Sequence, residues 1–265
     1  MRKGMKRGLF EALRERTGAT RDAARLIGLR RIHPDDTYIV SFPRSGNTWV
    51  RFQIASMQHP EEDISFRNIE QFVPDIHKSR KLINSLPRPR IIKCHSPCFE
   101  AFPRFVYVLR DGRDAMISFY HYALGERSFR GSLREFLGSD VATRFGTWPH
   151  HALGALMYAR KNPERVLLVR YEDLIESPME QARRIADFCG LNVDEGVVRR
   201  ASARSRFSRL QEMERRHGSE IEGRNGFRFF RRGVPGQWKE TSIGEELRPF
   251  LEEAGEALSI LGYPL

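Results

Sequence analysis

The sequence predicts an α/β fold of three layers, in which helices flank a central, mostly parallel sheet. Four short apolar runs rich in β-forming residues alternate with segments whose apolar residues recur at helical spacing. These runs are 38–42, 90–95, 105–110 and 165–171. Such alternation is typical of βαβ units, whose strands are buried on both faces of a parallel sheet. With 265 residues, of which 40% are hydrophobic, the chain can bury one sizeable core.

The first strand, the turn after it and the helix that follows are the stretch around which the chain is organised. The run 38–42 is the strand, and Val50, Ile54 and Met57 recur at helical spacing. Residues 43–48 form the tight turn between them. Unpaired backbone N–H groups and the positive end of the helix dipole converge at such a turn. The turn therefore predicts an anion-binding site.

The side chains of this turn support the same reading. Gly46 lets the backbone approach a ligand, Ser45 and Thr48 add hydroxyl donors, and Arg44 adds a planar charged fork. A loop that binds nucleoside triphosphates places Lys and Ser/Thr directly after its last glycine, whereas Asn47 follows Gly46 here. We therefore expect a P-loop-like fold that binds an anion without a metal ion. An ordinary strand-to-helix turn with a solvent-facing arginine remains the alternative.

The next elements follow in chain order. Residues 58–90 contain two modest helical patterns that prolines punctuate, and the strand 90–95 comes after them. The strand 105–110 runs into a helix over 115–122, which Asp111 can cap.

The second half of the chain repeats the alternation. A helix over 147–163 begins at a Trp-Pro pair and ends at a proline, and the strand 165–171 follows it. Ser177, as N-cap, and Glu180, as its capping-box partner, open the next helix, which ends at Gly190.

The last part of the chain has a looser pattern. Residues 199–232 are rich in Arg, Ser and Gly, which predicts that this stretch contains a long loop that becomes ordered when a ligand binds. A final amphipathic helix, capped at Ser242, runs to Leu261.

Polar residues follow each predicted strand at its carboxyl end. They are Arg44 and Ser45 after the first strand, Lys93 and His95 at the second, Arg110 at the third and Tyr171 at the fourth. In an open parallel sheet the carboxyl ends of the strands lie at one edge. Ligands bind at this edge, at the point where the strand order reverses. Three cations, a histidine and an anion-binding loop predict a site for a multiply charged nucleotide and a proton transfer.

Several motifs together resemble the sulfotransferases that use 3′-phosphoadenosine 5′-phosphosulfate, and most closely those acting on small hydroxyl compounds. FPRSGNTW is similar to the loop that holds the 5′-phosphosulfate, and YVLRDGRDAMISFYHY to the strand and helix at the 3′-phosphate. FRFFRRGVPGQWKE resembles the family's closing segment, IKCHSP its catalytic segment, and GTWPHH and RYEDLIESP its supporting segments. The motifs occur in matching order over 37–240.

The resemblance implies a role for particular residues. His95 would be the general base, with Lys93 and Arg44 as its catalytic partners. The residues implied in binding the donor co-substrate are Arg44, Ser45, Gly46, Asn47, Thr48, Trp49, Arg110, Ser118, Tyr171, Ser205, Phe229, Arg231, Arg232 and Gly233. Among them, Arg110, Ser118 and the Arg231–Gly233 stretch match ligands of the 3′-phosphate, whereas Trp49, Tyr171 and Phe229 match residues around the adenine.

The sequence departs from the family pattern at three places. Arg44 stands where many members have lysine, Gly112-Arg113 where many have proline-lysine, and Gln237 where many have aspartate. The first two retain charge. The implied reaction is an in-line displacement, in which the base takes the proton of an acceptor hydroxyl that attacks sulfur. The acceptor, an alcohol, phenol, glycolipid or saccharide, has no readable code in the sequence.

The composition of the chain indicates its domain organisation and its location in the cell. The net charge of +11 falls mostly on residues 1–31, which hold ten Lys/Arg and three Asp/Glu, so we expect a basic arm before a domain over 32–265. The arm is a candidate for weak contact with a membrane surface. No apolar run reaches the ~18 residues of a membrane span, and the three cysteines do not form a disulfide framework. We expect a cytoplasmic protein without a metal.

Two other functions remain alternatives at this stage. A P-loop kinase of a small molecule shares the strand–loop–helix arrangement, although the Lys-Ser/Thr pair and an acidic metal ligand are missing. A nucleic-acid-binding module is suggested by the pI of about 10.0, but the charge lies in the arm and no nucleic-acid-binding signature occurs. We therefore expect no nucleic-acid partner, and the oligomeric state is not predicted.

Overall fold

The computed structural model describes residues 27–219, 221 and 227–265. Of the basic arm predicted at 1–31, only residues 27–31 are among them, so the expectation of membrane-surface contact falls outside the described residues.

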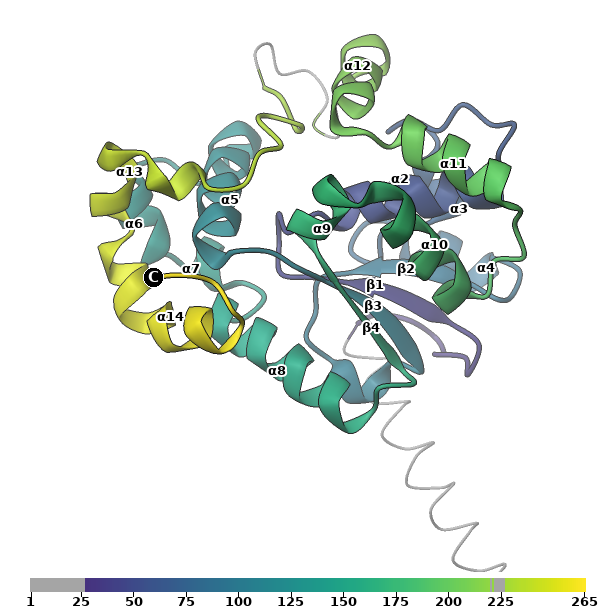
Figure 1. The fold of residues 1–265 in the computed structure, drawn as a ribbon, viewed down its shortest axis with the longest axis horizontal. Helices are drawn as coiled ribbons and strands as arrows, with labels where there is room; N and C mark the ends of the chain where they lie inside the picture. Colours follow the sequence, from purple (N-terminus) through teal and green to yellow (C-terminus); the bar gives the residue numbers. More distant parts are fainter. Residues whose placement is uncertain (1–26, 220, 222–226) are drawn as a thin grey trace, which may run out of the picture.

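Four parallel strands form one sheet in the order β2-β1-β3-β4 (Figure 1). Their bounds are β1 (Thr37–Val40), β2 (Ile91–Cys94), β3 (Arg104–Leu109) and β4 (Val166–Arg170). Thr37 of β1 is in register with Ile91 on one side and with Arg104 on the other. The predicted α/β class with a parallel sheet is confirmed, and the strand order reverses between β1 and β3.

The two faces of the sheet bury alternate residues of each strand, as the period of two requires. On β1, Tyr38 and Val40 join one apolar cluster and Ile39 joins the other. On β3, Tyr107 belongs to the first cluster and Val106 to the second. The strands are therefore apolar on both faces, which is why their sequences read as continuous apolar runs.

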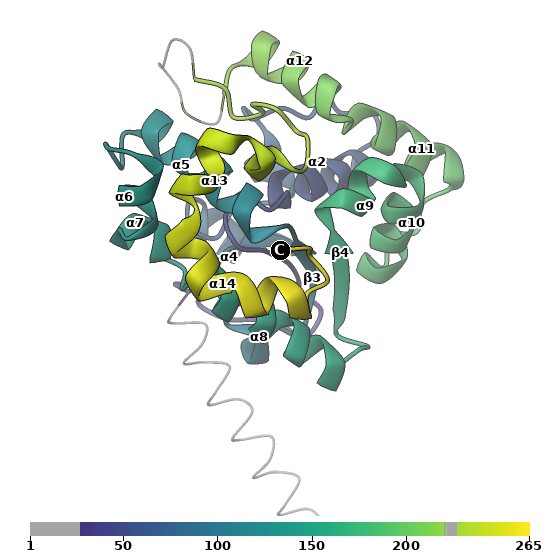
Figure 2. The same ribbon diagram turned by 60° about the vertical axis from the view of Figure 1, so that its left-hand side comes forward.

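Helices cover both faces and complete the three layers (Figures 1 and 2). The first cluster contains residues from α5 (Gly112–Glu126), α8 (Trp148–Lys161) and α14 (Arg248–Ile260). The second contains residues from α2 (Asn47–Gln58), α10 (Pro178–Cys189) and α11 (Glu195–Arg204). The shorter elements are α3 (Ile69–Phe72), α4 (Arg80–Ser85), η1 (Phe99–Ala101), α6 (Leu133–Leu137), α7 (Asp140–Thr143), α9 (Tyr171–Glu176), α12 (Phe207–His217), η2 (Gln237–Lys239) and α13 (Thr241–Glu246).

Part of the stretch 199–232, within which a long loop is predicted, is helical. The end of α11 and all of α12 lie within it. On α12, Leu210 and Glu214 are buried, whereas Arg209 and Arg216 pair with Glu212 on the exposed face. The arginines that suggested a loop thus form the solvated side of an amphipathic helix.

Helix ends agree with the sequence in part. Asp111 caps α5 by accepting a hydrogen bond from the Arg113 N–H, and Gly190 ends α10 at a φ of 66°. Ser177 is the N-cap residue of α10, but its side chain makes no capping hydrogen bond, so the predicted capping box is not formed. The predicted last helix is divided at Leu247 into α13 and α14.

Candidate active site

A cavity of about 300 Å³ opens at the carboxyl edge of the sheet. Its walls come from the turn after β1, the end of β2, the ends of β3 and β4, the helix α5 and the segment 227–237. Since this is the edge where the strand order reverses, the cavity occupies the position at which open parallel sheets bind ligands.

The turn between β1 and α2 brings backbone to the cavity. Arg44 and Gly46 both have positive φ, 66° and 104°, so the chain reverses sharply before α2 begins at Asn47. A side chain at position 46 would place its Cβ 2.8 Å from the Tyr171 ring, so this turn requires glycine. The first N–H groups of α2, which have no partner within the helix, therefore start at the cavity wall.

Arg44, Arg110 and Ser118 come together on one side of the cavity. Arg44 donates from Nε to Ser118 Oγ at 3.3 Å, and Arg110 donates from Nη1 to the Arg44 carbonyl oxygen at 3.0 Å. The Arg110 guanidinium lies over the Tyr171 ring, with Cζ 4.2 Å from the ring centroid. Arg44 also donates to the Phe229 carbonyl oxygen at 2.7 Å. Here Arg44 is thus engaged by residues that the sequence assigned to the 3′-phosphate and the adenine.

The segment 227–240, which we call the closing segment, forms another wall of the cavity. The carboxylate of Glu214 on α12 accepts hydrogen bonds from the Phe229 and Phe230 N–H groups. Asp114 on α5 accepts from the Gly236 and Trp238 N–H groups at 2.6 and 3.2 Å. Two buried carboxylates thus fix the backbone of this segment from α5 and α12.

The closing segment also supplies the predicted Arg231, Arg232 and Gly233 to the cavity wall. Arg231 donates to Gln237, and Arg232 pairs with Glu240. Gly233 has a φ of 69°, and a Cβ there would overlap the Phe207 ring.

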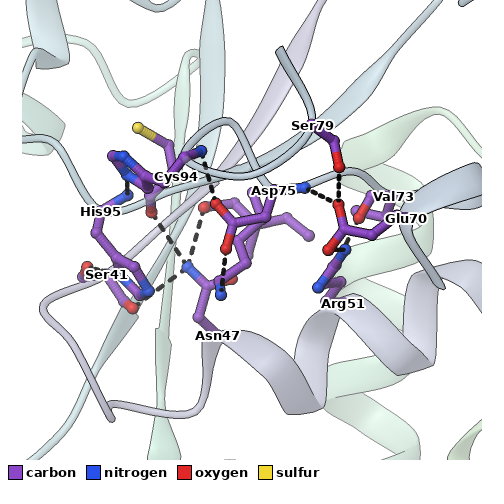
Figure 3. A network of polar contacts seen from close by, with 12 residues as sticks. Ser41, Asn47, Arg51, Glu70, Val73, Asp75, Ser79, Cys94 and His95 are labelled. Carbon is purple, nitrogen blue, oxygen red and sulfur yellow. Dashed lines mark hydrogen bonds and ion pairs between the residues drawn. The ribbon is translucent and has the colours of Figure 1, made fainter. Parts of the chain in front are cut away.

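One ring nitrogen of His95 is engaged in a hydrogen bond. Its Nδ1 lies 2.8 Å from the Ser41 carbonyl oxygen, so Nδ1 carries the proton and Nε2 keeps a lone pair (Figure 3). Burial, followed by the nearby Lys93 charge, lowers the pKa of His95 to about 3. His95 is therefore neutral at pH 7 and can accept a proton at Nε2.

Two further histidines hold the backbone of residue 95. The His95 N–H donates to His77 Nε2 at 3.2 Å, and the His95 carbonyl oxygen accepts from His151 Nε2 at 3.0 Å. His151, fully buried, receives a hydrogen bond at Nδ1 from the Tyr107 hydroxyl at 2.8 Å. Burial lowers the pKa of His151 to about 4, so it stays neutral. The sequence assigned no role to His151 and did not single out His77.

Lys93 lies beside His95 in sequence and is paired with a buried carboxylate that the sequence reading missed. Its Nζ is 2.7 Å from Asp75 Oδ2, and both side chains are almost inaccessible. Burial alone would raise the pKa of Asp75, but the Lys93 ammonium holds it well below its ordinary value. Asp75 reaches this place because its segment bridges to Lys93 in parallel, alongside β2.

A second ion pair, between Arg51 and Glu70, helps to hold the backbone of Asp75 (Figure 3). Glu70 accepts hydrogen bonds from the Asp75 N–H and the Ser79 hydroxyl, and pairs with Arg51 at 2.6 Å. Arg51 projects from α2 and also donates to the Val73 carbonyl oxygen. The helix α2 therefore also fixes the segment that carries Asp75.

The remaining predicted residues divide into three groups. Trp49 and Tyr171 line the cavity with their rings edge to face at 5.8 Å, and Thr48 lines it too. Asn47 contributes to the wall, but its side-chain amide donates to the Ile39 and Cys94 carbonyl oxygens and so ties β1 to β2.

Ser45 and Ser205 lie outside the residues that line this cavity. Both are buried, and the Ser205 hydroxyl donates to the Ala201 carbonyl oxygen at 2.8 Å. Ser205 borders a different hollow, between α2 and α12. Phe207, which follows it closely and was not singled out, lines the main cavity instead.

Within 27–219, 221 and 227–265, no group of three or more His, Cys, Asp or Glu side chains is arranged to hold a metal ion. Over the same ranges, no helix has both the length and the hydropathy needed to cross a bilayer.

Comparison with known families adds independent information. A family model described as "Sulfotransferase domain" matches residues 34–256. Sulfotransferase 1 family member D1 of Mus musculus is 25% identical over 245 residues, covering 83% of this chain and 82% of that protein. Human sulfotransferase 1C2 is 27% identical over 231 residues, covering 78% and 77%.

Solved structures share the fold. Retinol dehydratase in complex with androsterone and the inactive cofactor PAP has a TM-score of 0.67 at 19% identity, covering 93% of this chain and 86% of its own. Mouse sulfotransferase SULT7A1 complexed with PAP has a TM-score of 0.63 at 21% identity, covering 86% and 85%.

Proposed function

The chain belongs to the sulfotransferase domain family, and from this premise we propose how its cavity works. The donor is 3′-phosphoadenosine 5′-phosphosulfate, and the acceptor is a hydroxyl group of a small molecule. Two solved structures with this fold contain PAP, and one of these also contains androsterone. Neither of the alternatives, a small-molecule kinase or a nucleic-acid-binding module, is favoured by the family match.

One observation carries the assignment of the donor site. Arg44 comes from the turn after β1, and Arg110 and Ser118 come from the β3–α5 stretch, yet the three meet at a single place on the wall of the cavity that His95 also lines. Arg110 and Ser118, with Arg231 and Arg232 of the closing segment, provide the charge and hydroxyl that a 3′-phosphate requires. The turn at Gly46, at the start of α2, suits the 5′-phosphosulfate.

The aromatic residues of the cavity suit the adenine between these two anionic ends. Trp49 and Tyr171 line one stretch of the wall, and Phe207 and Phe229 also contribute rings. Flat apolar rings bind a base by stacking and exclude water from the charged groups nearby.

His95 is the proposed general base. Its Nε2 takes the proton as the acceptor oxygen forms a bond to sulfur, while the bond from sulfur to the bridging oxygen of the 5′-phosphate breaks. The leaving phosphate oxygen keeps that electron pair and is stabilised by the Lys93 ammonium and the amides at the start of α2. Asp75 holds Lys93 beside the base, so this positive charge is already in place before the reaction.

Thermal unfolding with nucleotides tests the donor site. At about 100 times its dissociation constant, PAP should stabilise the protein by about 2.7 kcal/mol and raise Tm by roughly 5–10 °C, whereas AMP and ATP give smaller shifts. Arg110→Ala should lose most of the PAP shift. Arg160→Ala, an exposed residue of α8, is the matched control and should keep it. Equal shifts from PAP and AMP would contradict the assignment of a 3′-phosphate site.

A further inference from the structure

Part of the cavity wall carries charged and aromatic side chains that have no proposed contact with the donor. We call it the acceptor end, and it is formed by His77, Lys78, Phe119, Glu126, Arg144 and Phe145. These residues come from α5, from the segment before α4 and from the segment after α7. They can therefore select the molecule that presents its hydroxyl to His95.

Phe145 lies next to the proposed base. Its ring centroid is 5.5 Å from that of His95 and 5.0 Å from that of His77. The rings of His77 and His95 are nearly parallel, at 9°. Flat surfaces on this scale favour a planar acceptor ring whose hydroxyl points to Nε2 of His95.

The Arg144 guanidinium also lies near the Phe145 ring. Its Cζ is 5.5 Å from the Phe145 ring centroid and 5.1 Å from that of Phe119. Contact with both rings fixes the direction of the side chain, although it keeps 38% of its accessible surface. The imidazole of His95 and the guanidinium of Arg144 are thus both close to the Phe145 ring.

The charge of Arg144 is only loosely compensated. Within the described part of the chain its one ion pair is with Glu126 at 3.9 Å, a distance beyond the range of a hydrogen bond. Glu126 is itself within hydrogen-bond distance of the Ser128 hydroxyl, at 3.2 Å. The guanidinium of Arg144 can therefore donate two parallel hydrogen bonds to a carboxylate. Lys78 adds a second positive charge to the same end.

We propose that the acceptor is an aromatic hydroxyl compound that carries a carboxylate at the end opposite its hydroxyl, with Arg144 as the residue that binds the carboxylate. This inference rests on the proposed sulfuryl transfer and adds the class of acceptor to it. The reaction itself is unchanged, and the carboxylate takes no part in it.

Three phenols that differ only in the distal group test the proposal. They are 3-(4-hydroxyphenyl)propanoate, its primary amide and tyramine, which present a negative, a neutral and a positive group. Two methylenes insulate the phenol from that group, so the three hydroxyls are similar nucleophiles. We expect kcat/KM for the propanoate to exceed that for the amide by about tenfold or more, as for a hydrogen bond between charged groups, with tyramine lowest.

Variants locate the origin of this preference. In Arg144→Gln the ratio of propanoate to amide should fall to about one, with kcat for the amide little changed, because only the carboxylate contact is lost. Glu126→Gln should keep or increase the ratio, because a competing carboxylate is removed. Arg160→Gln, on the exposed face of α8, is the matched control and should behave as the unmodified protein.

The outcomes separate this inference from the function on which it rests. If PAP stabilises the protein but the amide or tyramine is as good an acceptor as the propanoate, or none is sulfated, the acceptor proposal is wrong and the donor site stands. If Arg144→Gln retains the preference, Arg144 is not its source. If PAP gives no stabilisation, the sulfotransferase assignment of the cavity fails first.

Discussion

His95 is held by hydrogen bonds at three points. Ser41 fixes the ring through Nδ1, His77 accepts from the backbone N–H, and His151 donates to the carbonyl oxygen. Because each contact comes from a different segment, these contacts restrict both rotation of the ring and movement of the backbone. The proposed base is therefore held in a geometry that needs little reorganisation when the acceptor binds.

We predict that His95→Gln lowers kcat by a factor of about 10² to 10⁴, because glutamine can keep a hydrogen bond but cannot take a proton at neutral pH. The dissociation constant for PAP should change little. Steady-state kinetics and calorimetric titration with PAP measure the two quantities.

The control for this substitution is His150→Gln. His150 is exposed on α8, next to the buried His151. A His95→Gln protein that turns over at the unmodified rate would show that another group is the base.

Asp75 and Lys93 show how a charge is kept inside a cavity. A lysine ammonium as inaccessible as this one would be costly to bury alone, but Asp75 lies 2.7 Å from it. Glu70 and Arg51 then fix Asp75 from the side of α2. The position of Lys93 thus depends on a chain of polar contacts that starts at α2.

At the scale of elements, the closing segment depends on two helices. Glu214 of α12 accepts the Phe229 and Phe230 N–H groups, and Asp114 of α5 accepts those of Gly236 and Trp238. The arginines that face the donor site lie between these two anchors. A change in either helix should therefore weaken donor binding more than it slows the chemical step.

Glu214→Gln tests this coupling. Replacing one carboxylate oxygen by an amide NH₂ leaves a buried N–H without an acceptor, which costs about 1–3 kcal/mol. We expect PAP to bind roughly tenfold more weakly, with kcat at saturating donor nearly unchanged. Calorimetric titration and saturation kinetics check the two parts.

Glu212→Gln on the same helix is the matched control. Glu212 pairs with Arg209 and Arg216 on the exposed face, so its loss should leave PAP binding unchanged. Equal PAP affinities in the two variants would mean that the anchor at Glu214 does not support the donor site.

At the scale of the whole molecule, buried neutral histidines make stability depend on pH. Burial lowers the pKa of His95 to about 3 and that of His151 to about 4, whereas both are near 6.5 when the chain unfolds. The unfolded chain therefore binds more protons below pH 6.5, and the stability these groups contribute is lost as pH falls from there. Glu172 and Asp114, whose carboxyl pKa values burial raises, offset part of this loss.

We predict that the free energy of unfolding falls between pH 7.5 and 5, by about 2 kcal/mol for each of these two histidines. Urea unfolding at several pH values measures it. His95→Gln should reduce the pH dependence by about that amount, because glutamine does not titrate. An unchanged pH dependence in the variant would show that His95 is not a buried neutral group.

Much of the site was readable from the sequence because its residues follow strands directly. The apolar runs locate the strands, parallel pairing brings their carboxyl ends to one edge, and Arg44, Lys93, His95 and Arg110 lie at those ends. The position of these residues at one edge of the sheet thus follows from the apolar pattern of the strands and their order in the chain. The Arg-rich composition of α12, by contrast, did not indicate a helix, because its buried stripe is narrow.

The sequence by itself determined the fold class and the turn between β1 and α2, which requires glycine at position 46, and it predicted His95 as the base. Tertiary structure alone decided which side chains surround them: Asp75 on Lys93, Arg144 over Phe145, and Glu214 under the closing segment. It also turned the Ser205 hydroxyl back onto its own helix, away from the cavity, and brought Phe207 there. The physical reason is that periodicity and turn chemistry act between near neighbours in the chain, whereas these contacts join segments far apart in it and exist only after the layers pack.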